Sequence, residues 1–284
     1  MRVGNGVLAL LGITVLLAAI PAAQAQAPPG PDRSLEKVKI DPNGAPPPVP
    51  IEEIIRQFAA KESEFRLARG EYTYTQTVLV EDLGKFGDKI GEYRVVSDII
   101  FTPDGKRYEK ITFAPPHTLQ SISMTQEDER DIANVFPFVL GTEELPKYDL
   151  EYLGRQPVDE IGTYVFSIRP KRMEPGQRYF QGTVWVDDRE LQIVKSFGKS
   201  VPDSPKKSQE NLFPMFETWR EQIDGKYWFP TLTRANDTLH FKTGGGDVRI
   251  KISVRYTNYK RFRSTTRILN AEPVKPEEKK PPQR

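Results

Sequence analysis

The sequence predicts a mainly β fold of the α+β class, in which an antiparallel sheet of about ten strands carries two helices against one face. Most of the chain alternates apolar and polar residues, which is the period of a half-buried strand. Turn-forming Gly and Asp residues separate these runs at short intervals. Two segments space their apolar residues as a helix does. Together these patterns indicate one domain built around a single sheet.

The clearest strand covers residues 248–257, where every even position is apolar or aromatic and every odd position is polar. Residues 71–81 and 163–169 show a similar alternation. Such a strand has one dry face and one solvated face, which is typical of antiparallel sheets. Turn signals at 103–106 and 224–226 lie between β-rich runs and favour hairpin connections. We therefore expect a long meander that is strongly curved or partly closed.

Two segments have helical spacing. Residues 51–69 carry an apolar stripe, with Pro50 at the entrance and Gly70 just beyond the end, which are helix start and stop signals. Residues 126–136 begin with three acidic residues, whose charge complements the helix dipole, and Pro137 should end this helix. The stripe of the first helix consists of Ile51, Ile54, Ile55, Phe58 and Phe65.

The first 25 residues have the pattern of a secretory signal peptide. Arg2 precedes an apolar run over residues 7–20, and Ala23-Gln24-Ala25 forms a small-residue cleavage site before Gln26. The apolar run is too short to span a bilayer comfortably. We expect an exported protein, periplasmic or secreted, from which the signal peptide is cleaved. Retention of this segment as a membrane anchor is the alternative.

Proline-rich polar segments flank the predicted domain. Residues 26–50 favour extended polyproline conformations and form a linker, and residues 264–284 form a polar tail that we expect to be disordered. Residues 51–263 remain as the folded β domain.

Composition excludes several classes of protein. The chain has no cysteine, so it has neither disulfides nor a thiol nucleophile, and no cysteine that would be acylated in a lipoprotein. The 41 basic and 39 acidic residues are interspersed and give a formal charge of +2, which predicts no nucleic-acid partner. A basic cluster at 259–263 is interpreted as the solvated end of a strand, although it would also allow peripheral contact with a membrane.

No catalytic motif is present. His117 and His240 lie outside any metal-binding spacing, and no serine lies in a G-x-S-x-G sequence. The nearest paired carboxylates are Asp187-Asp188 with Glu190, or Glu143-Glu144. Asp187-Asp188 occupies a predicted hairpin tip, where Asp serves turn geometry. We therefore predict a protein that is not an enzyme and has no catalytic residue, metal or cofactor. An enzyme that uses these carboxylates is the least favoured alternative.

Apolar side chains on the predicted sheet exceed what two short helices would cover. A curved sheet that its helices fill incompletely leaves an apolar groove, where a hydrophobic ligand would bind. The alternative is that these side chains simply fill the core. The groove candidates are Tyr72, Tyr74, Phe101, Tyr164, Phe166, Ile168, Trp185, Phe216, Ile250 and Ile252. Helix 51–69 is the predicted lid, through Ile54, Ile55, Phe58 and Phe65.

The strand and turn motifs resemble those of a known superfamily. Gly182-Thr183-Val184-Trp185-Val186-Asp187 turns into Leu191-Gln192-Ile193-Val194-Lys195, and residues 216–219 and 228–230 follow as a further strand pair. With the order of signal peptide, helix, hairpin and second helix, this pattern resembles the outer-membrane lipoprotein-sorting (LolA/LolB/RseB-like) superfamily over most of residues 51–262. The resemblance implies a half-barrel with two or three helices on its concave face. It also implies a cavity for acyl chains, lipidated proteins or sensed peptides.

The resulting functional hypothesis is a periplasmic, non-enzymatic binding protein. It would hold a lipid, acyl chain or lipoprotein in an apolar groove, as a monomeric carrier or sensor. The alternative is an envelope structural or interaction adaptor whose core is filled by its own side chains and which contacts another envelope protein through its proline-rich segments.

Overall fold

The computed structural model describes residues 46–102, 106–202, 214–241 and 246–262, so the predicted signal peptide, the tail and most of the linker lie outside the described residues. The elements along the chain are α1 (Ile51–Arg69), β1 (Tyr72–Leu83), β2 (Lys89–Phe101), β3 (Arg107–Phe113), α2 (Gln126–Asn134), the short 3-10 helix η2 (Leu145–Lys147), β4 (Tyr148–Arg155), β5 (Thr163–Pro170), β6 (Tyr179–Asp187), β7 (Ile193–Val201), β8 (Phe216–Ile223), β9 (Tyr227–Phe241) and β10 (Gly246–Arg261).

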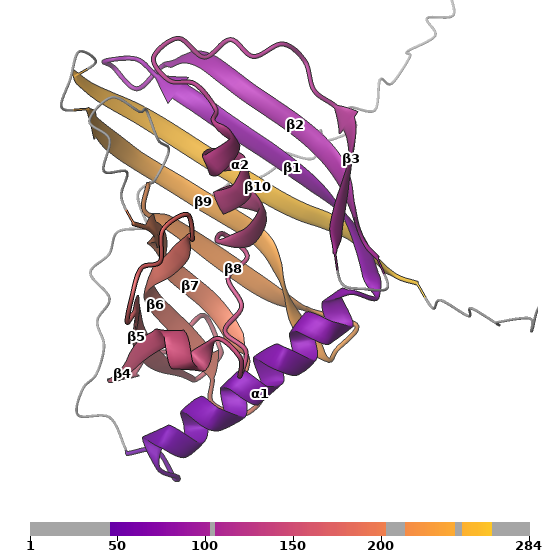
Figure 1. Cartoon of the computed structure of the whole chain (residues 1–284), viewed down its shortest axis with the longest axis vertical. Coiled ribbons are helices and arrows are strands. Elements are labelled where there is room, and N and C mark those ends of the chain that lie inside the picture. Colours follow the sequence, from indigo (N-terminus) through magenta and orange to yellow (C-terminus); the bar gives the residue numbers. More distant parts are fainter. Residues whose placement is uncertain (1–45, 103–105, 203–213, 242–245, 263–284) are drawn as a thin grey trace, which may run out of the picture. The chain divides into compact units, whose positions relative to one another are not determined.

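The described strands form one ten-stranded antiparallel sheet in the order β3-β2-β1-β10-β9-β8-β7-β6-β5-β4. Every strand from β4 to β9 pairs with the strand that follows it along the chain. The last strand, β10, then pairs with β1. The sheet is open, since β3 and β4 lie at its two edges. The chain from β3 to β4 passes from one edge to the other and carries α2 across the sheet (Figure 1). The predicted fold class is confirmed.

Alternating burial defines the two faces of the sheet. In β1 each even position from Tyr72 to Asp82 is buried and the positions between them are half-buried. In β10 each even position from Val248 to Tyr256 is buried, and the odd positions are exposed or half-buried. The buried face belongs to the main core cluster, which also contains Phe58 of α1 and Ile132 of α2. Both helices therefore cover the same, concave face of the sheet.

Local sequence explains where the helices begin and end. Pro50 precedes α1, Glu52 and Glu53 occupy its first turn, and it ends with Arg69 before Gly70. The helix α2 begins at a capping box, in which the Thr125 side chain accepts a hydrogen bond from the Asp128 backbone N–H while the Asp128 carboxylate accepts one from Thr125 N–H. It ends at Asn134, two residues before the predicted end, and η2 supplies the third, short helix.

A buried ion pair connects α1 to the sheet. Glu62 of α1 and Arg220 of β8 have side chains only 0% and 3% exposed. Arg220 Nη1 donates to Glu62 Oε1 at 2.9 Å and to Oε2 at 3.1 Å, and the backbone N–H of Ile193 donates to Oε1 at 3.2 Å. Arg220 Nη2 also donates to the Phe138 carbonyl, and its guanidinium lies 5.1 Å from the ring of Phe65. Both charges are thus compensated inside the core.

Removing one member of this pair should be far more costly than removing both. We expect Glu62→Met to lower the free energy of unfolding by about 3–5 kcal/mol, because it leaves the Arg220 guanidinium buried without a counter-charge. The double variant E62M/R220M should recover most of this loss. Urea unfolding of the wild type, both single variants and the double variant measures the effect.

The control is the exposed pair between Glu53 and Arg56 on the same helix. Glu53→Gln should leave the free energy of unfolding nearly unchanged, because ion pairs in solvent contribute little. Additive losses in the double variant E62M/R220M would contradict the ion-pair interpretation.

Candidate functional site

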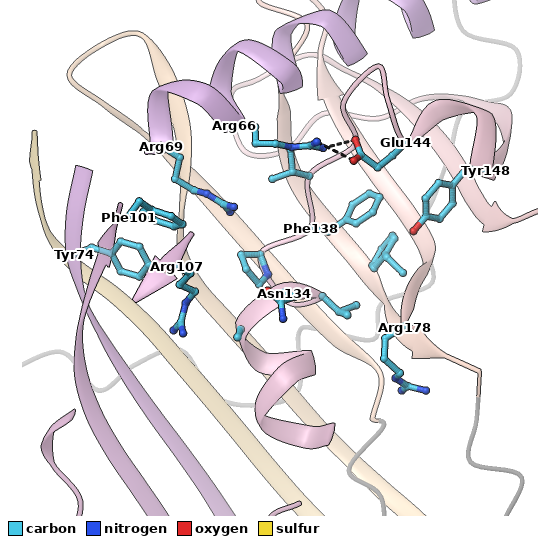
Figure 2. Close-up of a pocket in the computed structure, with 15 residues that line it drawn as sticks. Arg66, Arg69, Tyr74, Phe101, Arg107, Asn134, Phe138, Glu144, Tyr148 and Arg178 are labelled. Atoms are coloured by element: carbon cyan, nitrogen blue, oxygen red, sulfur yellow. Dashed lines mark hydrogen bonds and ion pairs between the residues drawn. The ribbon is translucent and has the colours of Figure 1, made fainter. Parts of the chain in front are cut away.

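A pocket of about 340 Å³ lies between α1, the end of α2 with the segment that follows it, and the concave face of the sheet (Figure 2). Its volume is within the range of small-molecule sites. It is lined by Arg66, Arg69, Tyr74, Phe101, Arg107, Ala133, Asn134, Val135, Pro137, Phe138, Val139, Glu144, Tyr148, Arg178 and Phe180. The lining thus combines four arginines and one glutamate with five aromatic rings.

Arg66 ties α1 to the segment before β4. Its Nη1 donates to Glu144 Oε1 at 2.8 Å and its Nη2 donates to Oε2, so that the two groups form a bidentate pair (Figure 2). This hydrogen bonding raises the pKa of Arg66 above its ordinary value. One turn earlier, the backbone N–H of Thr142 donates to Ser63 Oγ at 2.9 Å. Two polar contacts therefore hold the C-terminal half of α1 at the pocket.

Arg107 and Arg178 also have carboxylate partners. Arg107 Nη1 donates to Glu109 Oε2 at 2.7 Å, and its Nη2 donates to Gln76 Oε1 at 2.7 Å. Arg178 Nη2 donates to Asp131 Oδ2 at 2.8 Å, which ties α2 to the start of β6. Each of these charges is compensated by a side chain of the protein itself.

Arg69 differs from the other three arginines. Among the residues that the structure describes, no carboxylate or carbonyl accepts a hydrogen bond from its guanidinium. Its Nε atom is fully enclosed without a partner, as is that of Arg107, but the two Nη atoms of Arg107 have the partners given above. The guanidinium points into the pocket (Figure 2) and lies 5.1 Å from the ring of Phe101. Desolvation by burial lowers the pKa of Arg69 below its ordinary value. The side chain still carries its charge at neutral pH, because the ordinary pKa of arginine is above about 12.

The contacts that Arg69 does make do not offset its burial. A cation–π contact contributes about 0.5–2 kcal/mol, and a cation at a helix C-terminus gains about 0.3–1 kcal/mol from the helix dipole. The effective penalty for removing an ion from water is several kcal/mol when no opposite charge is near. The pocket therefore holds a positive charge that its described surroundings leave uncompensated.

Tyr74 and Phe101 are the predicted groove residues that line the pocket. The other predicted groove residues are buried elsewhere. Tyr164, Phe166, Ile168, Phe216, Ile250 and Ile252 belong to the main core, and Tyr72 packs with Phe65 and Phe229 in a separate cluster. The ring centroids of Phe138 and Phe180 are 4.4 Å apart, and those of Phe136 and Phe216 are 4.3 Å apart. Side chains of the protein thus fill most of the predicted groove.

Trp185 lies on the opposite face of the sheet, so its predicted place in the groove is wrong. It pairs in register with Val165 and not with Phe166, and it packs with Val165 and Val194. Successive residues of a strand point to opposite faces. Val184 and Val186 lie on the concave face, so Trp185 between them faces outward. The Lys195 ammonium lies 5.0 Å from its ring on this outer face.

The predicted lid residues face the sheet. Ile54, Phe58 and Phe65 are buried, and Ile55 is half-buried against the main core. The ring centroid of Phe58 is 5.5 Å from that of Phe166. Their stripe therefore covers the concave face, while Arg66 and Arg69 on the same helix reach the pocket.

The carboxylates of the β6–β7 turn have structural contacts. Asp187 Oδ1 accepts hydrogen bonds from the backbone N–H groups of Arg189 at 2.7 Å and Glu190 at 2.9 Å, which is the turn geometry expected of an aspartate. Asp188 pairs with Arg155, and Glu190 accepts from Trp228 Nε1 at 2.9 Å. Within the described ranges no group of three or more His, Asp or Glu side chains is arranged to hold a metal ion.

No helix in the described part of the chain is long and apolar enough to cross a membrane.

The arginines and Phe138, Tyr148 and Phe180 are pocket residues that the sequence patterns did not identify. Arg66 and Arg69 lie in the last turn of α1, where basic residues are common because they complement the helix dipole. Phe138 follows α2 without any periodic pattern. The sequence feature that could have indicated these residues is the predicted lid helix, because its C-terminal turn carries two of the pocket's four arginines.

The chain matches none of the protein-family models and no curated protein. Several solved structures are similar to it, among them the following three. A DUF1329 family protein from Desulfovibrio piger is 16% identical, with 75% of this chain and 93% of that one covered at a TM-score of 0.39. A LolA superfamily protein from Nitrosomonas europaea is 11% identical, with 72% of this chain and 94% of that one covered at a TM-score of 0.32. MucB is 13% identical, with 69% of this chain and 92% of that one covered at a TM-score of 0.23.

The second of these structures carries the name of the superfamily that the sequence motifs resemble. At TM-scores below 0.5 none of the three assigns a function to this chain.

The contact between Ser63 and Thr142 predicts an efficient engineered disulfide. Ser63 Oγ and Thr142 Oγ1 are 3.3 Å apart, and the chain has no cysteine that would compete. We expect the double variant S63C/T142C to form the disulfide on oxidation and to gain about 3–5 kcal/mol in free energy of unfolding, since the bond closes a long loop. Mass measurement and urea unfolding with and without reductant test this. Failure to oxidise would show that the segments around Ser63 and Thr142 do not lie together as described.

Proposed function

We propose that this protein is a non-enzymatic binding protein that holds the acyl chain of a lipid or lipoprotein in the pocket beside α1, as a carrier or sensor in the periplasm. The single observation that carries this proposal is the pocket of about 340 Å³, which remains between helix and sheet although the surrounding core is filled. The resemblance of the strand motifs to a lipoprotein-sorting superfamily points in the same direction.

The chemistry of the lining supports an amphipathic ligand. Phe101, Phe138 and Phe180 present aromatic surface, while burial raises the pKa of the Tyr148 hydroxyl to about 12, so that it remains neutral. Enclosing about eight methylenes would contribute about 6 kcal/mol, at about 0.8 kcal/mol each, before the cost of immobilising the ligand. A ligand of this length binds with useful affinity without any covalent step.

The helix α1 is the proposed lid. Exchange of ligand would require separation of its C-terminal half from the segment at Thr142 and Glu144, which the Arg66 pair and the Ser63 contact hold. The buried ion pair of Glu62 makes such opening rare, because breaking it costs several kcal/mol and each 1.4 kcal/mol lowers the open population about tenfold. In the oxidised S63C/T142C variant, uptake and release of ligand should therefore slow by at least about tenfold.

A second function is favoured by the burial of the other predicted groove residues. If the pocket takes no ligand, the protein is an envelope adaptor with a core that its own side chains fill, and its proline-rich segments make the contacts with a partner. Removal of residues 26–45 and 264–284 separates the two functions, because a carrier retains its ligand while an adaptor loses its partner.

Filling the pocket tests the proposed function directly. The neutral apolar dye N-phenyl-1-naphthylamine should bind the purified protein with an increase in fluorescence. Ala133→Trp places a large ring at the pocket lining and should weaken dye binding by at least about tenfold, since the ring occupies the ligand volume.

Ala60→Trp is the matched control, because Ala60 lies on the exposed side of α1. It should leave dye binding unchanged. Equal dye affinity of the A133W variant and the wild type, or no dye binding by the wild type, would contradict the carrier proposal and favour the adaptor.

A further inference from the structure

We infer that the ligand of this pocket carries an anionic group, a carboxylate or a phosphate, which pairs with the guanidinium of Arg69. This inference rests on the proposed function and specifies the chemical class of its ligand. It assigns two parts to the site: an aromatic wall for the apolar chain and one arginine for the charged end.

The four arginines of the pocket provide an internal comparison. Arg66, Arg107 and Arg178 each donate to a carboxylate, at 2.8 Å to Glu144, 2.7 Å to Glu109 and 2.8 Å to Asp131. All four line the same pocket, so burial alone does not account for the difference at Arg69. Within the described residues, three of the four pocket arginines therefore have an acidic partner, and Arg69, whose guanidinium points into the pocket (Figure 2), has none.

The surroundings of Arg69 favour an external anion. Its guanidinium lies over Phe101, close to the Tyr74 and Tyr259 hydroxyls, and no carboxylate is among the described neighbours that influence its charge. The positive charges of Arg66 and Arg220 are also near and lower the pKa of Arg69 further. An anion at this point would supply both the missing charge and the missing hydrogen-bond acceptor, in a site of low dielectric where such a pair is strong.

The shape of the guanidinium selects the kind of anion. Its planar fork of N–H donors matches the two oxygens of a carboxylate or a phosphate and forms two parallel hydrogen bonds with them. Phe138 and Phe180 line the pocket on its other side and are stacked on each other, which places apolar surface within reach of a chain attached to that anion. An anionic amphiphile therefore satisfies the whole lining, whereas a neutral one leaves Arg69 unpaired.

Ligands with one chain and different ends test this inference. Decanoate, decyl phosphate and decanol are titrated against the dye-loaded protein, with inorganic phosphate as a fourth probe. We expect the wild type to bind at least one of the two anionic amphiphiles about tenfold or more tightly than decanol. The stronger of decanoate and decyl phosphate identifies which anion the site accepts.

The variant Arg69→Met should reduce this preference to about onefold, because it removes the charge and keeps the apolar stem. Arg56→Met is the matched control, since it removes the same charge from an exposed position of the same helix and should retain the full preference. If R69M does not fold, Arg69→Lys should keep a weakened preference, because it retains the charge without the fork.

The outcomes distinguish failure of the anion assignment from failure of the proposed function. Equal binding of decanol and the anionic amphiphiles by the wild type, or an undiminished preference in R69M, would overturn the anion assignment and leave the carrier function standing. Inorganic phosphate that binds as tightly as decyl phosphate would instead overturn the proposed acyl-chain function and leave the anion contact at Arg69 standing, because the chain would then contribute nothing. If the wild type binds neither the dye nor any amphiphile, the proposed function and the anion assignment fail together.

Discussion

The architecture around the pocket depends on the buried ion pair between Glu62 and Arg220. Glu62 receives hydrogen bonds from Arg220 and from the backbone of Ile193, and Arg220 donates in turn to the Phe138 carbonyl. One pair therefore joins α1, β7, β8 and the segment after α2. Since Arg66 and Phe138 form two walls of the pocket, the relative position of those walls follows from this pair. A charge pair specifies such an arrangement more narrowly than apolar packing, which tolerates sliding.

The crossing from β3 to β4 determines how much of the concave face remains available. This connection is held at both ends by carboxylates: Asp82 accepts hydrogen bonds from the backbone N–H groups of Gln120 and Ser121, and Asp131 pairs with Arg178. It brings α2 and the aromatic residues that follow it over the sheet (Figure 1). The protein thus fills with its own chain most of the space that an uncovered half-barrel would offer, and the pocket is what remains at the C-terminal half of α1.

The pocket differs in character from the predicted groove. An apolar trough along the whole sheet would hold a long chain by area alone, whereas the observed site is short, aromatic and rich in arginine. Arg69 is half-buried and has no acid beside it among the described residues, an arrangement that is unfavourable in the empty protein and favourable once an opposite charge binds. Sites that sacrifice some stability in this way are typical of function, because the compensating group comes from outside the fold.

The sequence by itself determined the elements: the strand alternation, the two helices, the hairpin turns at Asp187 and Asp224, and the face that each side chain of β1 and β10 presents. These follow from local periods of 2 and 3.6 residues and from turn chemistry, which need no distant partner. The wrong prediction for Trp185 is of the same local kind, because the alternation from Val184 places this residue on the outer face.

Only the tertiary structure decided which polar residues would be buried together. Glu62 follows Phe58 at helical spacing in the apolar stripe of α1, so its burial was open to prediction, but its partner lies 158 residues further along the chain. The same holds for the pairing of Arg66 with Glu144, and for the absence of such a partner for Arg69 among the described residues. Periodicity specifies which face of an element a residue lies on. It does not specify which residue of another element lies opposite, because charge pairing acts through space between groups that chain order does not relate.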